Sequence, residues 1–275
     1  MQRFHLLGTI VRRQDFNEHA AVLGFQAPEI AASAHPGQFL EIKVSGVLWR
    51  RPMSIYRCEG DVVEILVAVM GAGSRSLFQS KIGEKLDVIG PLGNQFPVDK
   101  ITEVDKLEMI IAGGVGIAPF PFLVERLQRQ GRTPTIFVGA RTKSQLLLGH
   151  LPTEQVHIAT DDGSEGYKGN VVDLFTNFIN AHSIDVRNIV VYACGPQGML
   201  RSLQKVVRAR RIQAWISIER EMACGLGICQ GCAVRLADGG QRGLQNSSGE
   251  KDAPDVRYAL ACTDGPIFDA TSIIL

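Results

Sequence analysis

The first hundred residues carry short apolar runs with the two-residue period of β-strands. Residues 62–69 are rich in β-branched side chains, and residues 39–44 alternate apolar and polar positions. Turn signals separate these runs, at Pro36-Gly37, Gly60-Asp61, Gly71 to Gly73, Gly83 and Gly90-Pro91. Short strands with turns at such spacing predict a small antiparallel barrel over residues 1–100.

From about residue 101 the pattern changes to apolar strands that alternate with amphipathic helices. Apolar runs at 109–112, 135–138, 156–159 and 189–193 predict strands. Apolar residues recur at helical spacing in three further stretches, which contain Phe120, Leu123, Val124 and Leu127, then Val171, Leu174, Phe175 and Phe178, then Met199, Leu203, Val206 and Val207. This alternation predicts a parallel sheet over residues 101–213, with ligands at the carboxyl ends of its strands.

The last region, residues 214–275, opens with a short strand and then holds four of the six cysteines. Cys224, Cys229 and Cys232 have the spacing C-x4-C-x2-C, and Cys262 follows near the C-terminus. This is the plant-type spacing for a [2Fe–2S] cluster. Glycines at 225, 227 and 231 allow the sharp turns that a short loop of thiolates requires. We therefore predict that all four cysteines ligate one cluster.

Two other interpretations of the cysteines fit less well. A structural zinc site usually presents two C-x2-C pairs, and this region has one. A disulfide framework is typical of small secreted domains, whereas this chain has 275 residues. Cys58 shows no ligand spacing and is expected to be structural or solvated. Trp49 and Trp215 are expected to be packing residues.

Composition narrows the class of protein and of partner. A chain of 275 residues with 45% hydrophobic and 21% charged residues is ordinary for a globular protein and has room for two or three domains. Its net charge of +1 gives no electrostatic reason to expect nucleic acid or an anionic membrane as a partner. The N-terminus lacks the apolar core of a signal peptide, and no stretch approaches the length that spans a bilayer. Six cysteines without an export signal favour a reducing compartment, so we expect a cytoplasmic protein.

Two segments of the barrel region are candidates for binding an anion. Residues 50–56 place Arg51, a rigid proline and Ser54 on an extended strand. Residues 71–77 form a Gly/Ser turn before a predicted helix, which can aim backbone N–H groups at a phosphate. Taken alone, Arg51 is also typical of a surface charge, and the glycine turn is also typical of an ordinary turn.

The sheet region has its candidates at the strand ends. Gly113, Gly114 and Gly116 could admit a pyrophosphate against the N-terminus of the helix that follows. Pro119 stands where the Rossmann fingerprint has its third glycine, so that fingerprint is not met.

Two other strand ends carry polar or reactive side chains. Asp161 and Asp162 could bind ribose hydroxyls or form an Asx turn. Cys194 could line the site or be an ordinary buried cysteine. Arg141 could contact a 2′-phosphate, but no arginine cluster marks such a site, so the sequence favours NAD over NADP.

The barrel segments resemble the flavin motifs of the ferredoxin reductase superfamily. In that superfamily the arginine pairs bidentately with the FAD diphosphate and the hydroxyl faces the isoalloxazine. The resemblance therefore implies that FAD is bound by the first motif, Arg51, Pro52, Met53 and Ser54, by the lining strand, Leu66, Val67 and Ala68, and by the second diphosphate turn, Gly73 and Ser74.

The strand ends of the sheet region are similar to the two pyridine-nucleotide motifs of the same superfamily. The first is the glycine turn at 113–119. The second is Cys194-Gly195-Pro196, whose cysteine lies near the nicotinamide in that superfamily. The resemblance implies NAD as a second cofactor.

The cluster region follows the nucleotide-binding region, and this order restricts the resemblance to fewer families of the superfamily. Glu219 precedes the cysteines and Asp264-Gly-Pro-Ile-Phe268 follows the last one, which is similar to the electron-transfer subunits of class 1B dihydroorotate dehydrogenase. The segments at 90–94 and 160–164 match that family too. The family implies an FAD-binding β-barrel domain over 1–100, an NAD-binding α/β domain over 101–213, and a [2Fe–2S] cluster domain over 214–275.

The family also implies the activity. Its partner is an FMN-containing subunit that oxidises dihydroorotate in pyrimidine biosynthesis, and electrons pass from it through the cluster and FAD to NAD in a heterotetramer. A flavin is needed because nicotinamide exchanges a hydride and the cluster single electrons. One departure is the 29 residues between Cys232 and Cys262, where the family usually has a short link. The extra stretch, about 238–257, is expected to be a surface loop beside the cluster, because closure entropy grows only logarithmically with length.

Other interpretations use the same modules. The chain could instead be the NAD-binding gamma subunit of a sulfhydrogenase, the small subunit of a ferredoxin-dependent transhydrogenase, or an oxygenase reductase. A neighbouring gene for a dihydroorotate-oxidising barrel would separate these. A redox-sensing or assembly module, whose cluster regulates binding without turnover, belongs to a different class. NADH oxidation with an artificial acceptor distinguishes it, because a sensor would show negligible turnover.

Overall fold

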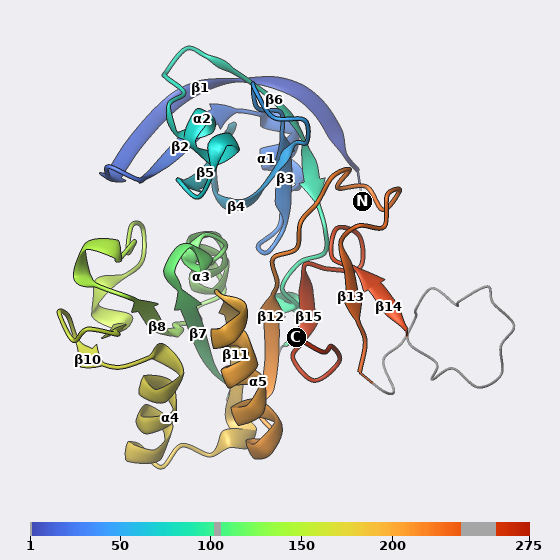
Figure 1. Ribbon diagram of the computed structural model, residues 1–275. Coiled ribbons are helices and arrows are strands. Elements are labelled where there is room, and N and C mark those ends of the chain that lie inside the picture. Colours follow the sequence, from blue (N-terminus) through green and yellow to red (C-terminus); the bar gives the residue numbers. More distant parts are fainter. Residues whose placement is uncertain (1, 102–105, 238–256) are drawn as a thin grey trace, which may run out of the picture.

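The apolar runs of the first hundred residues form a closed barrel in the order β1-β2-β5-β4-β3-β6, with every neighbouring pair antiparallel. The computed structural model describes residues 2–101, 106–237 and 257–275, and Figure 1 shows the barrel above a second sheet. The barrel elements are β1 (Phe4–Asn17), β2 (Ala20–Gln26), α1 (Pro28–Ser33), β3 (Phe39–Ile42), β4 (Arg51–Glu59), β5 (Val62–Ala68), α2 (Ala72–Phe78) and β6 (Lys85–Leu92). The predicted antiparallel barrel is confirmed.

The alternation along β3 has an unexpected consequence. Leu40 and Ile42 belong to the apolar core of the barrel. Phe39 and Glu41 alternate with them and therefore lie on the outer face. That face normally meets water, but Phe39 is 4% exposed and Glu41 is 0% exposed. Another part of the chain therefore covers the outer face of β3.

The second sheet has seven strands in the order β10-β9-β8-β7-β11-β12-β15. Neighbours from β10 to β12 are parallel, and β15 pairs antiparallel with β12. Its strands are β7 (Leu107–Gly113), β8 (Thr135–Ala140), β9 (Val156–Thr160), β10 (Tyr167–Lys168), β11 (Ile189–Cys194), β12 (Gln213–Ser217) and β15 (Ile267–Asp269). The crossover helices are α3 (Phe120–Arg129), α4 (Val171–Ala181) and α5 (Gln197–Arg210). The predicted parallel sheet is confirmed, with one antiparallel strand added at its edge.

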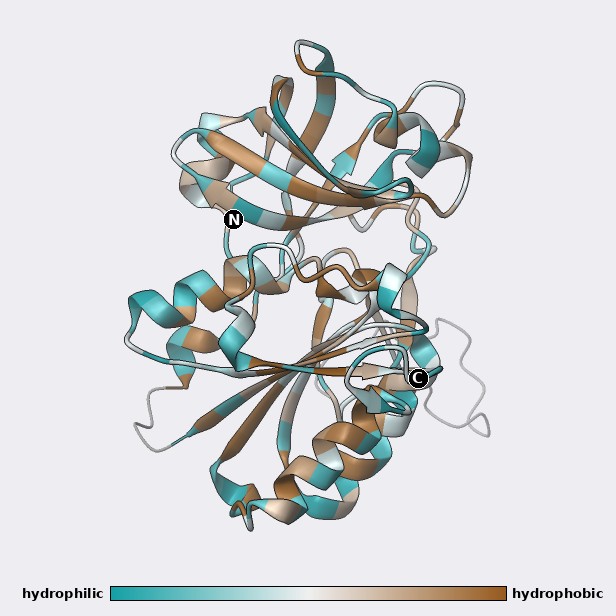
Figure 2. Ribbon diagram, turned by 90° about the vertical axis from the view of Figure 1, so that its left-hand side faces the viewer, coloured by the Kyte–Doolittle hydropathy of each residue, from teal (hydrophilic) through white to brown (hydrophobic). Residues whose placement is uncertain are grey.

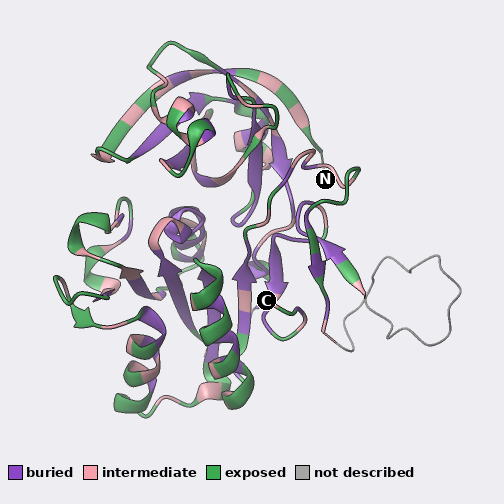
Figure 3. Ribbon diagram, in the orientation of Figure 1, coloured by how far each residue is buried: buried purple, intermediate pink, exposed green. Residues whose placement is uncertain are grey.

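The helices cover both faces of this sheet. Ile110 and Ala112 of β7 share a core with α3, whereas Met109 and Ile111 share a core with α4 and α5. Figure 2 shows the hydrophobic strands between helices on either side. In Figure 3 the buried residues concentrate in the strands, while the outer sides of the helices are exposed. Among the described residues, no helix combines the length and apolar character needed to cross a membrane.

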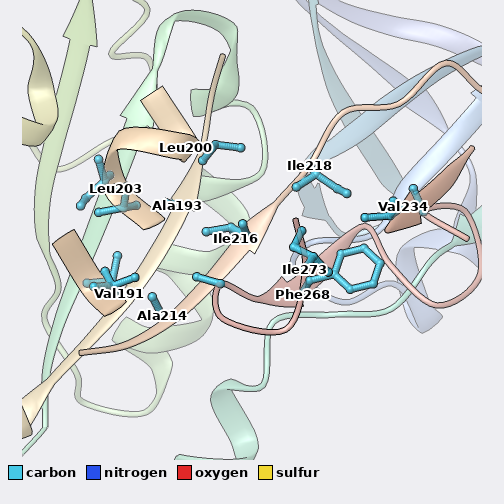
Figure 4. Close-up of a cluster of buried hydrophobic side chains, with 14 of the residues drawn as sticks. Val191, Ala193, Leu200, Leu203, Ala214, Ile216, Ile218, Val234, Phe268 and Ile273 are labelled. Carbon is cyan, nitrogen blue, oxygen red and sulfur yellow. The ribbon is translucent and has the colours of Figure 1, made fainter. Parts of the chain in front are cut away.

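The C-terminal region is connected to the side of the sheet that ends in β12 and β15. A small antiparallel hairpin, β13 (Ala233–Arg235) and β14 (Tyr258–Leu260), lies between β12 and β15 in sequence. Figure 4 shows Ile216 and Ile218, on and just after β12, in one apolar cluster with Val234 and Phe268. One sheet and one core thus run across the proposed boundary at residue 213, and the three-domain division stays a proposal. Positions 238–256, nearly all of the predicted extra stretch, lie outside the described residues.

Candidate functional site

The four predicted ligand cysteines lie in two pairs. Cys232 and Cys262 are each 2% exposed, and their Sγ atoms share a hydrogen bond at 3.2 Å. The Sγ atom of Cys224 accepts the backbone N–H of Cys229 at 3.4 Å and a hydrogen bond from the Cys229 side chain. All six cysteines of the chain are free thiols. The cluster loop, which we define as residues 219–232, therefore supplies one complete pair and half of the other.

The two pairs of thiols provide the ligands that a binuclear cluster needs. Among the described residues, no group of three or more His, Cys, Asp or Glu side chains could hold one ion. Two pairs of thiols offer two sulfur ligands to each of two irons, which is the ligand count of a four-cysteine [2Fe–2S] cluster. The backbone N–H of Leu226 also donates to Cys224 Sγ at 3.4 Å. The donor set therefore fits a [2Fe–2S] cluster.

The β13–β14 hairpin brings Cys262 to the cluster loop. Ala233 pairs with Leu260 in this hairpin, and the N–H of Ala261 donates to the carbonyl of Cys232 at 3.0 Å. Cys232 and Cys262 flank these residues and are held side by side by the same ladder. This ladder therefore brings the two thiols together.

The two cysteine pairs differ in their electrostatics. Burial raises the pKa of Cys262 to about 12, and its hydrogen bond with Cys232 acts in the same direction. Burial also disfavours the thiolate of Cys224, but backbone N–H groups of Cys229 and Leu226 outweigh it and lower the pKa of Cys224 to about 7. Because the thiolate is the form that binds metal, Cys224 is the better prepared ligand before the cluster is inserted.

The turns of the cluster loop agree only in part with the predicted ones. Gly225 and Gly227 have φ angles of +65° and +84°, the left-handed region that favours glycine. Gly231 does not adopt a positive φ angle, and Gln230 takes one of +57° instead. The prediction for Gly231 is wrong, because the turn before Cys232 is made one residue earlier.

Asn94 and Glu41 are two of the residues through which the barrel contacts the C-terminal region. The side-chain amide of Asn94 donates to the carbonyls of Asp264 and Ile267, both at 2.8 Å, and accepts the N–H of Ile267 at 2.9 Å. Glu41 lies against Gly225, since a Cβ built on that glycine would stand 2.5 Å from Glu41 Cγ. Sequence reasoning missed Glu41, because a glutamate in an alternating strand carries the signal of a solvent-facing position.

The predicted flavin residues lie on neighbouring strands at the start of β4 and the end of β5. Arg51 is exposed and reaches the start of α2, where a Cβ on Gly73 would stand 3.0 Å from Arg51 Cδ. There Ser74 Oγ accepts the backbone N–H groups of Met70 and Gly71 at 2.8 and 3.0 Å. A guanidinium beside this turn fits a diphosphate, and a larger residue at Gly73 would press on the Arg51 side chain. The FAD contacts themselves stay a prediction.

The two predicted nucleotide segments lie side by side at the carboxyl ends of β7 and β11, which are strands inside the sheet. β7 and β11 are parallel neighbours, with Ala112 opposite Cys194. A Cβ on Gly116 would stand 2.4 Å from the carbonyl oxygen of Cys194, so only glycine fits at this position. Gly114, in contrast, meets nothing within 4 Å, which leaves its face open. We call this edge, formed by residues 113–116 and 194–196, the nucleotide edge.

Cys194 lies at the nucleotide edge and is also buried. Its exposed fraction is 4%, and its thiol hydrogen-bonds with the side chain of Ser217 on β12. Burial, followed by the nearby Glu219 carboxylate, raises the pKa of Cys194 to about 12. Cys194 is therefore a neutral thiol at physiological pH. Its contact with nicotinamide stays a prediction, and Ser217 is a neighbour that sequence reasoning did not find.

The acidic turn after β9 forms an Asx turn. Asp162 Oδ1 accepts the N–H and the hydroxyl of Ser164 at 2.9 and 2.6 Å. The N–H of Asp162 donates to the carbonyl of Arg141, so the acidic turn and this arginine are neighbours. Asp161 is exposed beside them. A ribose contact for Asp161 or Asp162 is not tested by these hydrogen bonds.

Three expectations outside these segments have different outcomes. Trp215 packs against a buried core, as expected. Burial raises the pKa of Cys58 to about 12, as suits a structural cysteine. Trp49 is 55% exposed and its neighbour Leu48 is 85% exposed, so the packing role expected for Trp49 is wrong. Both lie in the connection between β3 and β4, where no core covers them.

Comparisons with known proteins agree with this geometry. Residues 219–274 match the iron–sulfur cluster binding domain of dihydroorotate dehydrogenase B, and residues 110–205 match the oxidoreductase NAD-binding domain. The dihydroorotate dehydrogenase B (NAD(+)) electron transfer subunit of Shouchella clausii is 32% identical, over 97% of this chain and 97% of that protein. The subunit of the same name from Bacillus mycoides is 32% identical over all of both chains. This chain belongs to their family.

Solved structures show the same fold. The structure of an NADH-dependent reduced ferredoxin-NADP oxidoreductase has a TM-score of 0.77 and 25% identity, and the match covers 98% of this chain and 90% of that chain. The ferredoxin reductase in carbazole 1,9a-dioxygenase has a TM-score of 0.65 and 18% identity, over 77% of this chain and 67% of that chain. The predicted ferredoxin-reductase-like fold is confirmed.

Proposed function

We propose that this chain is the electron-transfer subunit of a dihydroorotate-oxidising complex and passes electrons between an FMN-containing catalytic subunit and NAD in pyrimidine biosynthesis. It holds FAD and a [2Fe–2S] cluster and binds NAD. When bound, the flavin supplies hydride exchange with nicotinamide and single-electron exchange with the cluster. The observation that carries the proposal is the pairing of four cysteines where the barrel meets the edge of the nucleotide sheet.

We assign the flavin to the end of the barrel formed by β4, β5 and α2. Arg51 would hold the diphosphate with its planar fork, together with the α2 turn at Gly73 and Ser74. The ring would lie along Pro52, Met53 and Ser54 of β4 and along Leu66, Val67 and Ala68 of β5. The contact of β4 with α3, to which the ion pair of Arg57 with Glu125 contributes, holds the barrel against the nucleotide sheet.

We assign the pyrophosphate of NAD to Gly113, Gly114 and Gly116, and the nicotinamide to residues 194–196. The open face at Gly114 lets a ligand approach the backbone where the next helix begins. Cys194 would act by shape and polarisability rather than as a nucleophile, because its raised pKa keeps the thiol protonated.

We assign the ribose to Asp161 or Asp162 and infer NAD rather than NADP. The two carboxylates follow β9 at the same edge of the sheet, and they would repel a 2′-phosphate. Arg141 is the counter-argument, since its backbone contacts Asp162. Asp162→Ala would separate repulsion by the carboxylates from attraction by Arg141. If Asp162 repels the 2′-phosphate, this variant should use NADPH better than the wild type.

We propose that the catalytic subunit docks over the cluster loop and that two such pairs form a heterotetramer. Cys229 is exposed there, and the neighbouring Ile228 is 79% exposed. A large exposed apolar side chain beside a redox centre suits an interface that excludes water from the path of electrons. The six free thiols are compatible with the reducing cytoplasm, where we place the complex.

The test is reconstitution with a dihydroorotate-oxidising FMN subunit from the same source. The complex should reduce NAD with dihydroorotate, and the chain alone should oxidise NADH with an artificial acceptor. Native mass spectrometry should give a heterotetramer. A chain without iron and flavin after anaerobic purification and reconstitution would contradict the proposal.

A ferredoxin-linked transhydrogenase subunit is the second candidate. The match to the NADH-dependent reduced ferredoxin-NADP oxidoreductase structure favours it, because that match spans 98% of this chain, cluster region included. Reduced ferredoxin would then replace the dihydroorotate-oxidising subunit as electron donor. Assaying the purified chain with each donor, and the complex with each nucleotide, separates the two candidates.

A further inference from the structure

Glu41 is buried without a partner. Among the described residues, it is the only carboxylate in which both oxygens are buried and lack a hydrogen-bond partner. The other two buried glutamates are paired: Glu64 lies 3.2 Å from Arg57, and Glu108 pairs with Arg132. An unpaired buried carboxylate costs free energy in the folded state, so its presence requires an explanation that the paired glutamates do not need.

The carboxylate rests on the cluster loop. A Cβ built on Gly225 would stand 2.5 Å from Glu41 Cγ and 2.9 Å from Glu41 Oε1. Gly225 follows Cys224 directly, so the carboxylate lies beside the backbone of a predicted iron ligand. Any residue other than glycine at 225 would displace Glu41 or the loop. The left-handed turn at Gly225 and the buried carboxylate therefore occupy complementary space.

Arg50 and Arg51 do not hydrogen-bond the Glu41 carboxylate, and Arg50 reaches only the backbone carbonyl of Glu41, at 3.5 Å. Arg50 donates to Asp87 Oδ1 at 2.8 Å, and the side chain of Arg51 reaches Gly73. Burial raises the pKa of Glu41 to about 7 against the lowering effect of both arginines, and the charge of Cys224 raises it further. Electrostatic interaction is mutual, so a charge on Glu41 acts on the charge carried at Cys224.

We propose that Glu41 is a positioning residue for the redox chemistry and that its buried carboxylate holds the reduction potential of the cluster low. The inference rests on the proposed function, because it requires the cluster. Reduction would add one electron to the cluster that Cys224 helps to hold, and a negative charge buried beside this ligand would oppose the addition. No bond forms or breaks. A lower potential makes the cluster a stronger electron donor in the direction of NAD.

The experiment is a potentiometric titration of the cluster, followed by electron paramagnetic resonance, in the assembled protein. The titration is run at alkaline pH, because the expected effect requires a charged carboxylate. Glu41→Gln should raise the potential, with a shift of the reduction equilibrium of about tenfold, which is ~59 mV for a one-electron couple. Glu41→Asp should stay close to the wild-type potential. Glu64→Gln, the matched control in the same barrel, should not shift it.

A second substitution separates potential from folding. Glu41→Met keeps a similar volume and removes the unpaired charge, so the protein should unfold at the same or a higher temperature while its cluster potential rises. Unchanged potentials in both the Gln and the Met variants would overturn the inference. Loss of the cluster from both, with the Asp variant still loaded, would assign Glu41 to cluster assembly and would also overturn it. A wild-type protein without iron would instead defeat the proposed function.

Discussion

The nucleotide edge and the cluster loop hold their residues in different ways. At the nucleotide edge, two strand ends of one sheet meet backbone to backbone, with Gly116 pressed against the carbonyl of Cys194. The cluster site instead depends on three separate contacts: Glu41 of the barrel against the cluster loop, Asn94 against Asp264 and Ile267, and the β13–β14 hairpin that brings Cys262 to the loop. The nucleotide edge is therefore a local product of one sheet, whereas the cluster loop depends on the assembly of the whole chain.

The largest expected effect separates the two regions completely. Cys232→Ser removes one thiolate from the buried pair with Cys262 and should abolish iron binding and the visible absorption of the cluster. NADH oxidation by ferricyanide should persist, because that route needs only the barrel and the sheet. Iron analysis and steady-state kinetics check both statements. Cys58→Ser is the control and should keep its iron; loss of NADH oxidation in Cys232→Ser would show that the regions are not separable.

A smaller effect should follow when the barrel is detached from the cluster region. Asn94→Ala removes three hydrogen bonds, to Asp264 and Ile267. At 0.5–1.5 kcal/mol each, their loss should lower the free energy of unfolding by roughly 2–4 kcal/mol. Denaturant titration measures this, and release of iron with time should be faster. Asn177→Ala is the control on an exposed helix face; it removes one exposed hydrogen bond to Tyr167 and should lower stability by no more than about 1 kcal/mol.

The nucleotide edge should respond more locally. Gly116→Ala places a Cβ 2.4 Å from the Cys194 carbonyl oxygen, so the turn or the strand end must move. We expect NADH affinity to fall roughly tenfold, about 1.4 kcal/mol, with the iron content unchanged. Isothermal titration calorimetry and iron analysis test this pair of outcomes.

Gly198 provides a matched control for that substitution. It lies in α5, and a Cβ there meets nothing within 4 Å. Gly198→Ala should leave NADH affinity unchanged and stabilise the helix by about 0.5–1 kcal/mol. If both variants lost NADH affinity equally, the close contact between residue 116 and the Cys194 carbonyl would not explain the loss.

The smallest effect on the isolated chain concerns the exposed side of the cluster loop. Ile228→Glu should leave the free energy of unfolding within about 0.5 kcal/mol, because the side chain is 79% exposed. Affinity for the catalytic subunit should fall roughly tenfold or more, as for a central apolar contact. Ile82→Glu is the control. Ile82 is 62% exposed and lies near the start of β6, whereas Glu41, which rests on the cluster loop, pairs with Ile89 near the end of β6. Ile82 therefore lies at the other end of this strand. Equal binding by wild type and Ile228→Glu would move the docking surface elsewhere.

Much of the fold was predictable because its signals are local. The stripe Phe120, Leu123, Val124 and Leu127 lies buried along α3, as the period of 3.6 requires. The spacing of Cys224, Cys229 and Cys232 reflects a short loop that must present several thiolates to one cluster, so it needs no knowledge of the rest of the chain. Gly231 and Trp49 were misjudged, because a turn can shift by one residue and an aromatic in a connection can lack a covering core.

The sequence by itself determined the barrel pattern, the parallel strands and the identity of the candidate ligands, because residue type and spacing encode them over a few turns of chain. Only the tertiary structure decided that Cys232 pairs with Cys262 and that Glu41 is buried against Gly225. These contacts join residues far apart in the sequence, and burial depends on which distant element covers a face. The chemical character of a side chain is local, whereas its environment belongs to the fold.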